Sequence, residues 1–208
     1  MKDARIFPAT SMPDADWWAE LWPDPTDTLR RIGIREGTMV IDLCCGDGYF
    51  TAPMIRIVGS AGRVYAVDLD PEMLAQARIA VQDEGACIWI EADARALADE
   101  IPGKADFVLI ANTFHGIPDQ PAFCQGVAQV LTTGGRFAII SWHKRPREET
   151  PVLGKPRGPA SDMRMSPSDT EAVVAPAGFR LEETVELPPY HYGAVFRRKK
   201  TRNRAAPP

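Results

Sequence analysis

Hydrophobic residues recur along this chain in short runs that alternate with segments of helical spacing. The runs that predict buried strands lie at residues 39–43, 63–67, 86–90, 105–110 and 136–142. The segments of helical spacing lie at 49–58, 71–84, 94–100 and 119–131. Strands that alternate with helices favour a parallel sheet with helices on both faces and right-handed crossovers.

The pattern changes after residue 142. A stretch rich in Pro, Arg, Lys and Gly occupies residues 143–166, and its length is typical of a functional or a disordered segment. A helix is expected over about 168–177, followed by strands at 179–187 and 194–197 with a turn between them. This hairpin predicts an antiparallel last strand. The chain as a whole therefore predicts an α/β fold built on a seven-stranded, mostly parallel sheet.

A second helical region precedes the first strand. Residues 14–32 predict one or two short helices, which Pro23 and Pro25 interrupt. The apolar residues at helical spacing in it are Trp17, Trp18, Leu21 and Trp22.

The loop after the first strand is the most informative stretch of the chain. Asp42 lies near the strand end, where α/β sheets place ligand-binding groups. Gly46 and Gly48 follow, and glycines allow the backbone to approach a ligand closely. An acid beside such a loop suits a ligand that carries positive charge and disfavours a phosphate.

Two further strands also end in acids. The second expected strand leads into Asp68, and a carboxylate in that place can accept two hydrogen bonds from a ribose diol. The third leads into Asp93. A nicotinamide dinucleotide would require a loop closer to G-x-G-x-x-G, but Thr51 occupies the third glycine position.

Together these residues resemble motif I and the following acids of the class I S-adenosylmethionine (SAM) dependent methyltransferases. The motif I pattern is acid-x-G-x-G-x-G, and Cys44 replaces its first glycine. The resemblance covers roughly residues 38 to 142, with weaker agreement to about 198. It implies a Rossmann-like three-layer sandwich, with SAM as cofactor and S-adenosylhomocysteine as product. The cofactor-binding residues that it implies are Asp42, Gly46, Gly48, Asp68, Leu69, Asp93, Ala94 and Asn112.

The same resemblance suggests how the chain is divided. We expect residues 1–35 to form an N-terminal helical lid and residues 36–198 to form the methyltransferase domain. Residues 199–208 are expected to be a basic, flexible tail.

The three histidines are predicted to lie at one edge of the sheet. His115 follows the fourth strand, His143 follows the fifth, and His191 lies in the turn after the sixth. Histidine suits a base that works near neutral pH, so we take all three as catalytic candidates. His115 comes first, as base or as acceptor contact, with bracing of its loop as the alternative. Their spacing does not support a metal site.

Aromatic residues are predicted near the histidines and are candidates for substrate binding or for packing. They are Trp18, Trp22, Phe114, Trp142, Tyr190 and Tyr192.

The nature of the methyl acceptor stays open. Related enzymes that methylate planar amino groups carry an (Asn/Asp)-Pro-Pro-(Tyr/Phe) motif, which is missing after the fourth strand. A small molecule is favoured, with S-methylation of a small thiol or sulfide as the first hypothesis. The alternatives are O- or C-methylation of a phenol or quinone precursor, or SAM binding without catalysis.

Composition adds a few bounds. The net charge is −4, and without the six cations of residues 197–208 it would be −10, so nucleic acid is not expected as a partner. The four cysteines form no C-x-x-C pair. No apolar run is long enough to span a membrane, and no apolar signal begins the chain, so a cytoplasmic location is expected. The oligomeric state is left open.

Overall fold

A seven-stranded sheet forms the centre of the molecule. The computed structural model describes residues 15–81 and 87–200 of the 208-residue chain. The strands follow the order β3-β2-β1-β4-β5-β9-β8. Their bounds are β1 (Met39–Leu43), β2 (Arg63–Asp68), β3 (Cys87–Glu91), β4 (Ala105–Ala111), β5 (Leu131–Trp142), β8 (Phe179–Leu187) and β9 (His191–Arg198).

The predicted mostly parallel sheet is confirmed. β1 pairs in parallel with β2 and β4, β2 with β3, and β4 with β5. β9 is antiparallel to both of its neighbours, β5 and β8. The antiparallel strand that ends the chain therefore lies inside the sheet rather than at its edge.

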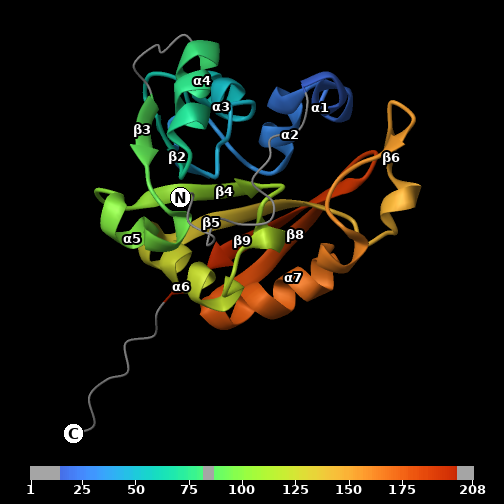
Figure 1. The fold of residues 1–208 in the computed structure, drawn as a ribbon. Helices are drawn as coiled ribbons and strands as arrows, with labels where there is room; N and C mark the ends of the chain where they lie inside the picture. The colour runs from blue at the N-terminus through green and yellow to red at the C-terminus, as the bar shows by residue number, and fades with distance from the viewer. Residues whose placement is uncertain (1–14, 82–86, 201–208) are drawn as a thin grey trace, which may run out of the picture.

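Helices cover both faces of the sheet and complete three layers (Figure 1). One face carries α1 (Ala15–Leu21), α2 (Pro25–Arg31), α3 (Thr51–Val58) and α4 (Pro71–Val81). The other carries α5 (Leu97–Glu100), α6 (Gln120–Val130) and α7 (Pro167–Val174). The short 3-10 turns are η1 (Ala94–Ala96), η2 (Phe114–Gly116), η3 (Arg147–Glu149), η4 (Ser161–Met163) and η5 (Ala175–Ala177).

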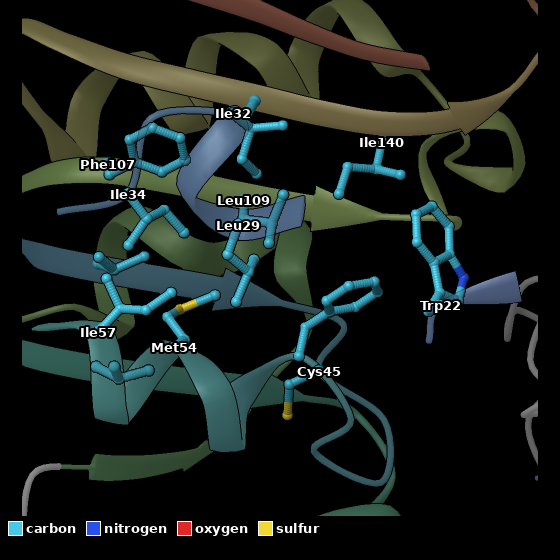
Figure 2. Packing of buried hydrophobic residues seen from close by; sticks show 14 of the residues in the cluster. Trp22, Leu29, Ile32, Ile34, Cys45, Met54, Ile57, Phe107, Leu109 and Ile140 are labelled. Carbon is cyan, nitrogen blue, oxygen red and sulfur yellow. The ribbon is translucent and has the colours of Figure 1, made fainter. Parts of the chain in front are cut away.

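Each face has its own apolar core because successive strand residues point to opposite sides. Ile140 belongs to the core under α1–α4, whereas Ile139 belongs to the core under α5–α7. In the first core, Leu29 of α2 and Met54 of α3 pack over Leu109 of β4 (Figure 2). Burying a side chain of this size contributes about 1.5–3 kcal/mol.

The last hairpin differs from its prediction. We expected a turn over 188–193 and a strand from Ala194, but β9 already begins at His191. Its pairing with β5 extends to Trp142 opposite His191. The turn is therefore limited to residues 188–190, and His191 is a strand residue.

The stretch 143–166 is ordered around one arginine. It contains the short strands β6 (Pro151–Val152) and β7 (Lys155–Pro156), which the sequence did not predict. The Arg164 guanidinium donates to the Thr150 hydroxyl at 3.0 Å and to the Arg157 carbonyl at 2.9 Å. This hairpin lies beside α1 (Figure 1).

No helix within 15–81 and 87–200 has the length and apolar character needed to cross a membrane. The first fourteen residues of the expected lid and most of the expected tail lie outside the described residues.

Candidate functional site

The glycine loop after β1 is held in place by β2 and α4. The amide of Gly46 donates to the Asp68 carboxylate at 2.8 Å, which ties the loop to the end of β2. Gly48 has a φ of 84°, and a Cβ there would lie 3.0 Å from the Cβ of Ala77 in α4. Gly46 and Gly48 thus allow a tight loop against the end of β2 and the middle of α4.

Cys44, which replaces the first glycine of the motif, keeps a glycine-like backbone. Its φ is 56°, in the left-handed region that costs a residue with a side chain about 1–2 kcal/mol. The replacement therefore preserves the path of the loop at a cost in strain. Backbone strain of this kind clusters at functional sites.

Asp42 lies beneath the loop and not on its surface. It is 2% exposed, and the Thr51 hydroxyl donates to it at 2.6 Å. Burial raises the pKa of Asp42 to about 7, with the Thr51 bond opposing this rise. One of its carboxyl oxygens is therefore engaged by Thr51 beneath the loop.

Three carboxylates converge on this loop. Burial raises the pKa of the Cys44 thiol, and the negative charges of Asp68, Asp42 and Asp93 raise it further. Asp93 is itself paired with Arg95, whose guanidinium lowers the pKa of that carboxyl. The loops after β1, β2 and β3, which we call the acidic half of the sheet edge, suit a cation and disfavour a dinucleotide phosphate.

Other groups here fit SAM. Leu69, next to Asp68, is an exposed large apolar side chain that an adenine ring would cover, whereas Ala94 is buried. Asn112, at the end of β4, has a φ of 58°, and both polar atoms of its buried side-chain amide lack a partner among the described residues. The cofactor residues implied by the sequence thus lie around one edge, and their contacts with SAM stay predictions.

A second group of side chains gathers at the end of β5 and the start of β9, beside the loop after β4. We call this region the aromatic half. The His191 ring lies 4.2 Å from the Trp142 ring and 4.6 Å from the Trp22 ring, centroid to centroid. His191 is 1% exposed, and neither ring nitrogen has a partner among the described residues. A buried polar group without a partner is costly, so a ligand that hydrogen-bonds to His191 would be stabilised here.

His115 faces the same region from η2. Its Nδ1 atom is buried and has no partner among the described residues. Burial lowers the pKa of His115 to about 4, and the positive charge of Arg164 lowers it further. The imidazole is therefore neutral at physiological pH and available as a hydrogen-bond partner.

The third histidine differs from the other two. His143 lies at the rim, where its Nε2 atom is 3.0 Å from a carboxylate oxygen of Glu186. Its backbone amide follows β5 and donates to the Tyr190 carbonyl at 2.8 Å. The predicted common edge holds for all three histidines, but His143 already has a carboxylate partner.

Two predicted substrate contacts lie on the opposite face of the sheet. Tyr192 follows His191 in a strand, so its side chain points the other way, and its hydroxyl is bonded to the Thr170 hydroxyl at 2.7 Å. Phe114 is 1% exposed and packs with Phe123 and Phe137 under α6. Both rings are therefore separated from Trp142 by the sheet, but the Tyr192 ring lies 5.2 Å from the ring of His143, as expected for an aromatic residue near a histidine. Their contacts with a substrate stay predictions.

The other aromatic candidates lie beside Trp142 or beside the glycine loop. Tyr190 stacks on Trp142 with a ring separation of 6.0 Å, and its hydroxyl donates to the Pro151 carbonyl. Trp18 and Trp22 pack against Phe50, just after the glycine loop. The end of α1 therefore lies over both halves of the edge, as a lid would.

Sequence reasoning missed Arg164. Its side chain is 2% exposed, and its guanidinium carbon lies 5.0 Å from the centre of the Trp142 ring. The signal in the sequence was weak: an arginine placed between Met163 and Met165, inside a stretch that resembled a loop.

Within the described residues, no group of three or more His, Cys, Asp or Glu side chains is arranged to hold a metal ion. Burial raises the pKa of both Cys44 and Cys45, so these thiols stay protonated and do not favour thiolate chemistry.

The sheet order, the glycine loop and the three acids at strand ends define a class I SAM-dependent methyltransferase domain. Residues 40–135 match the family described as "Methyltransferase domain".

The chain resembles curated enzymes over this region. It is 31% identical over 123 residues to a demethylmenaquinone methyltransferase of Lactococcus lactis, which covers 58% of this chain and 48% of the relative. It is 30% identical over 119 residues to a 2-phytyl-1,4-naphtoquinone methyltransferase of Trichormus variabilis, which covers 56% and 52%. The chain thus spans about half the length of the curated relatives that it matches.

A solved structure supports the same assignment over more of the molecule. The SAM-dependent methyltransferase of Aquifex aeolicus superposes with a TM-score of 0.71 at 27% identity, covering 84% of this chain and 89% of that one.

Proposed function

We propose that this protein transfers a methyl group from SAM to a small aromatic acceptor of the phenol or hydroquinone type, with a ring carbon as the favoured site of attack. The observation that carries the proposal is the aromatic half. There His191, against the rings of Trp22 and Trp142, buries two ring nitrogens that have no partner among the described residues, and His115 buries an Nδ1 atom that also has none among them. A planar acceptor with oxygen substituents would supply both the ring contacts and the missing hydrogen bonds.

The first hypothesis, methylation of a small thiol or sulfide, is less well supported. Sulfur is a weak hydrogen-bond acceptor and would leave most of these polar atoms without a partner. The curated relatives are named for quinone precursors, and this favours the phenol or quinone alternative.

The chain's own residues would position the acceptor and exclude water. When bound, SAM supplies an activated methyl group on a sulfonium centre, so little covalent chemistry is left to the protein. Trp22 and Trp142 would hold the acceptor ring, and neutral His115 would accept a proton or hydrogen bond from an acceptor hydroxyl. The lid formed by α1 would keep water out.

The test is methyl transfer from trideuteromethyl-SAM to a panel of reduced naphthohydroquinones, phenols, thiols and sulfide under anaerobic conditions. We expect a trideuteromethyl group on a ring carbon, located by mass-spectrometric fragmentation. Labelled sulfur products would restore the thiol hypothesis. SAM binding without any S-adenosylhomocysteine formed would overturn catalysis and favour a SAM-binding protein.

A further inference from the structure

Arg164 is a buried cation without an acidic partner. It is 2% exposed, and it forms no ion pair with any carboxylate in the described part of the chain. Taking a charged group out of water is costly unless it is paired. Burial and the charge of Arg147 lower the pKa of Arg164, and the charge of Glu148 opposes this only in part. An anion in contact with the guanidinium would therefore be stabilised.

The guanidinium is held in place with one nitrogen free. Nη2 donates to Thr150 and to the Arg157 carbonyl, and Nε donates to the Pro159 carbonyl at 3.2 Å. Nη1 is buried and has no hydrogen-bond acceptor among the described residues. Three bonds thus fix the group and leave a single donor nitrogen for something else.

The loop that carries these carbonyls lies flat on Trp142. A Cβ at Gly158, whose φ is 84°, would come within 2.7 Å of the Trp142 ring. Arg164 stacks on the same ring. The position of the guanidinium therefore depends on a contact that only glycine permits.

The Arg164 guanidinium lies in the aromatic half, because it stacks on Trp142, whose ring lies 4.2 Å from the ring of His191. Burial lowers the pKa of His115 and of His191, and the nearby charge of Arg164 lowers both further. The charge of Arg164 is absent from the groups that shift the pKa of Asp42 or Cys44 in the acidic half.

We propose that Arg164 Nη1 binds an anionic oxygen of the methyl acceptor, either a carboxylate or a phenolate. This inference rests on the proposed function and adds a charge to the acceptor that it names. A guanidinium suits this task because it is always protonated and presents a fixed array of donors. A neutral sulfide or thiol would leave the donor unused.

For a phenolate the contact has a chemical consequence. The electron pair of the deprotonated oxygen is shared with the adjacent ring carbon, which forms the bond to the methyl group as the carbon–sulfur bond breaks with its electron pair to sulfur. The acceptor enters as the phenolate, with its hydroxyl proton already lost to solvent, so neutral His115 is free to take the proton from that carbon as the ring regains aromaticity. Arg164 would favour this sequence by stabilising the oxyanion form of the acceptor.

The test uses two probes of equal shape, benzoate and benzamide, on the full chain saturated with S-adenosylhomocysteine. We expect benzoate to bind at least tenfold more tightly than benzamide, measured by calorimetry and by tryptophan fluorescence. Equal affinity, or no benzoate binding at millimolar concentration, would overturn the proposal.

Substitutions then test whether Arg164 is the positive charge that binds benzoate. Arg164→Met should weaken benzoate at least tenfold and leave benzamide unchanged, and Arg164→Lys should retain part of the preference. Arg145→Met, at an exposed arginine of the same stretch, is the matched control and should change neither probe. If Arg164→Met does not fold, the wild-type preference and Arg164→Lys decide the question. Benzoate affinity that survives in folded Arg164→Met would refute the role of Arg164.

The outcomes separate this inference from the proposed function. Anion binding that depends on Arg164, without methyl transfer to any acceptor of the panel, would leave this site standing and remove the enzyme activity. Methyl transfer to a naphthohydroquinone without any benzoate preference would support the enzyme activity and refute anion binding by Arg164.

Discussion

The acidic half and the aromatic half of the sheet edge differ in how their polar groups are satisfied. In the acidic half, Asp42 is bonded to Thr51, Asp68 to Gly46 and Asp93 to Arg95. In the aromatic half, His191 and Arg164 bury polar atoms without partners among the described residues. The three carboxylates of the acidic half have partners within the fold, whereas His191 and Arg164 bury polar atoms that an acceptor would satisfy.

This difference teaches where specificity resides. A preorganised half can bind a common cofactor, because its geometry is fixed by contacts within the fold. An incomplete half discriminates, since an acceptor that fails to satisfy its buried groups binds poorly.

The largest effect is expected from removing a polar side chain of the aromatic half, which should impair use of the acceptor and spare SAM binding. His115→Ala should lower kcat/KM roughly 10- to 100-fold, or about 1.4–2.7 kcal/mol, because the acceptor loses a hydrogen-bond partner. SAM affinity, measured by calorimetry, should stay within about twofold of wild type.

His143→Ala is the control for that variant, since His143 is already paired with Glu186 at the rim. We expect little change in turnover. A larger loss for His143→Ala than for His115→Ala would reverse the assignment of the two histidines.

The complementary change falls in the acidic half. Asp68→Ala should weaken SAM binding by about 1–3 kcal/mol, since it removes a charged acceptor and leaves the Gly46 amide without a partner. Acceptor-probe binding should change less than SAM binding. SAM affinity equal to that of wild type would eliminate the ribose assignment of Asp68.

The two halves also carry buried groups with opposite pH dependence. Because the folded-state pKa of Asp42 is raised to about 7, its contribution to stability is present below pH 3.8 and is lost as the pH rises to about 7. Because the pKa of His115 is lowered to about 4, the contribution of His115 to the stability of the fold is present above pH 6.5 and is lost as the pH falls to about 4.

Asp42→Asn tests the first of these effects and keeps an acceptor for the Thr51 hydroxyl. Its free energy of unfolding should rise relative to wild type at pH 8, by about 1 kcal/mol or more, and approach it at pH 4. Denaturant titrations at both pH values measure this, with the exposed Asp99→Asn as control. A constant difference across pH would show that Asp42 does not titrate with a raised pKa.

The smallest expected effect concerns the strained cysteine. Cys44→Gly should stabilise the fold by about 1 kcal/mol, since glycine adopts a φ of 56° without the clash of a Cβ. Thermal unfolding is the measurement. Destabilisation would mean that the packing of the Cys44 side chain outweighs its backbone strain.

The acidic half could be predicted from the sequence because it depends on local features. Asp42 and Asp68 lie at the ends of apolar runs, and parallel strands bring such ends to one edge. The glycine loop follows directly in the chain. The bounds of β1 and β8 matched their predictions for the same reason, since both are uninterrupted runs between clear boundaries.

The aromatic half depends on contacts between distant segments. Arg164 is oriented by Thr150, Arg157 and Pro159, and it stacks on Trp142 of another strand. No periodicity marks such a side chain. The face occupied by Tyr192 was not predicted because Pro188 and Pro189 suggested a longer turn. A strand that starts at His191 sends Tyr192 to the face opposite His191, where it lies beside His143.

One hydrogen bond described by the structure joins the two halves. The Tyr49 hydroxyl, one residue after Gly48, donates to the Trp22 carbonyl at 2.7 Å. A ligand that moves the glycine loop therefore also moves the ring that lies on His191. Thermodynamic linkage makes any such effect reciprocal: the factor by which SAM tightens an acceptor under Trp22 equals the factor by which that acceptor tightens SAM. The coupling between cofactor and acceptor is then the same whichever molecule binds first.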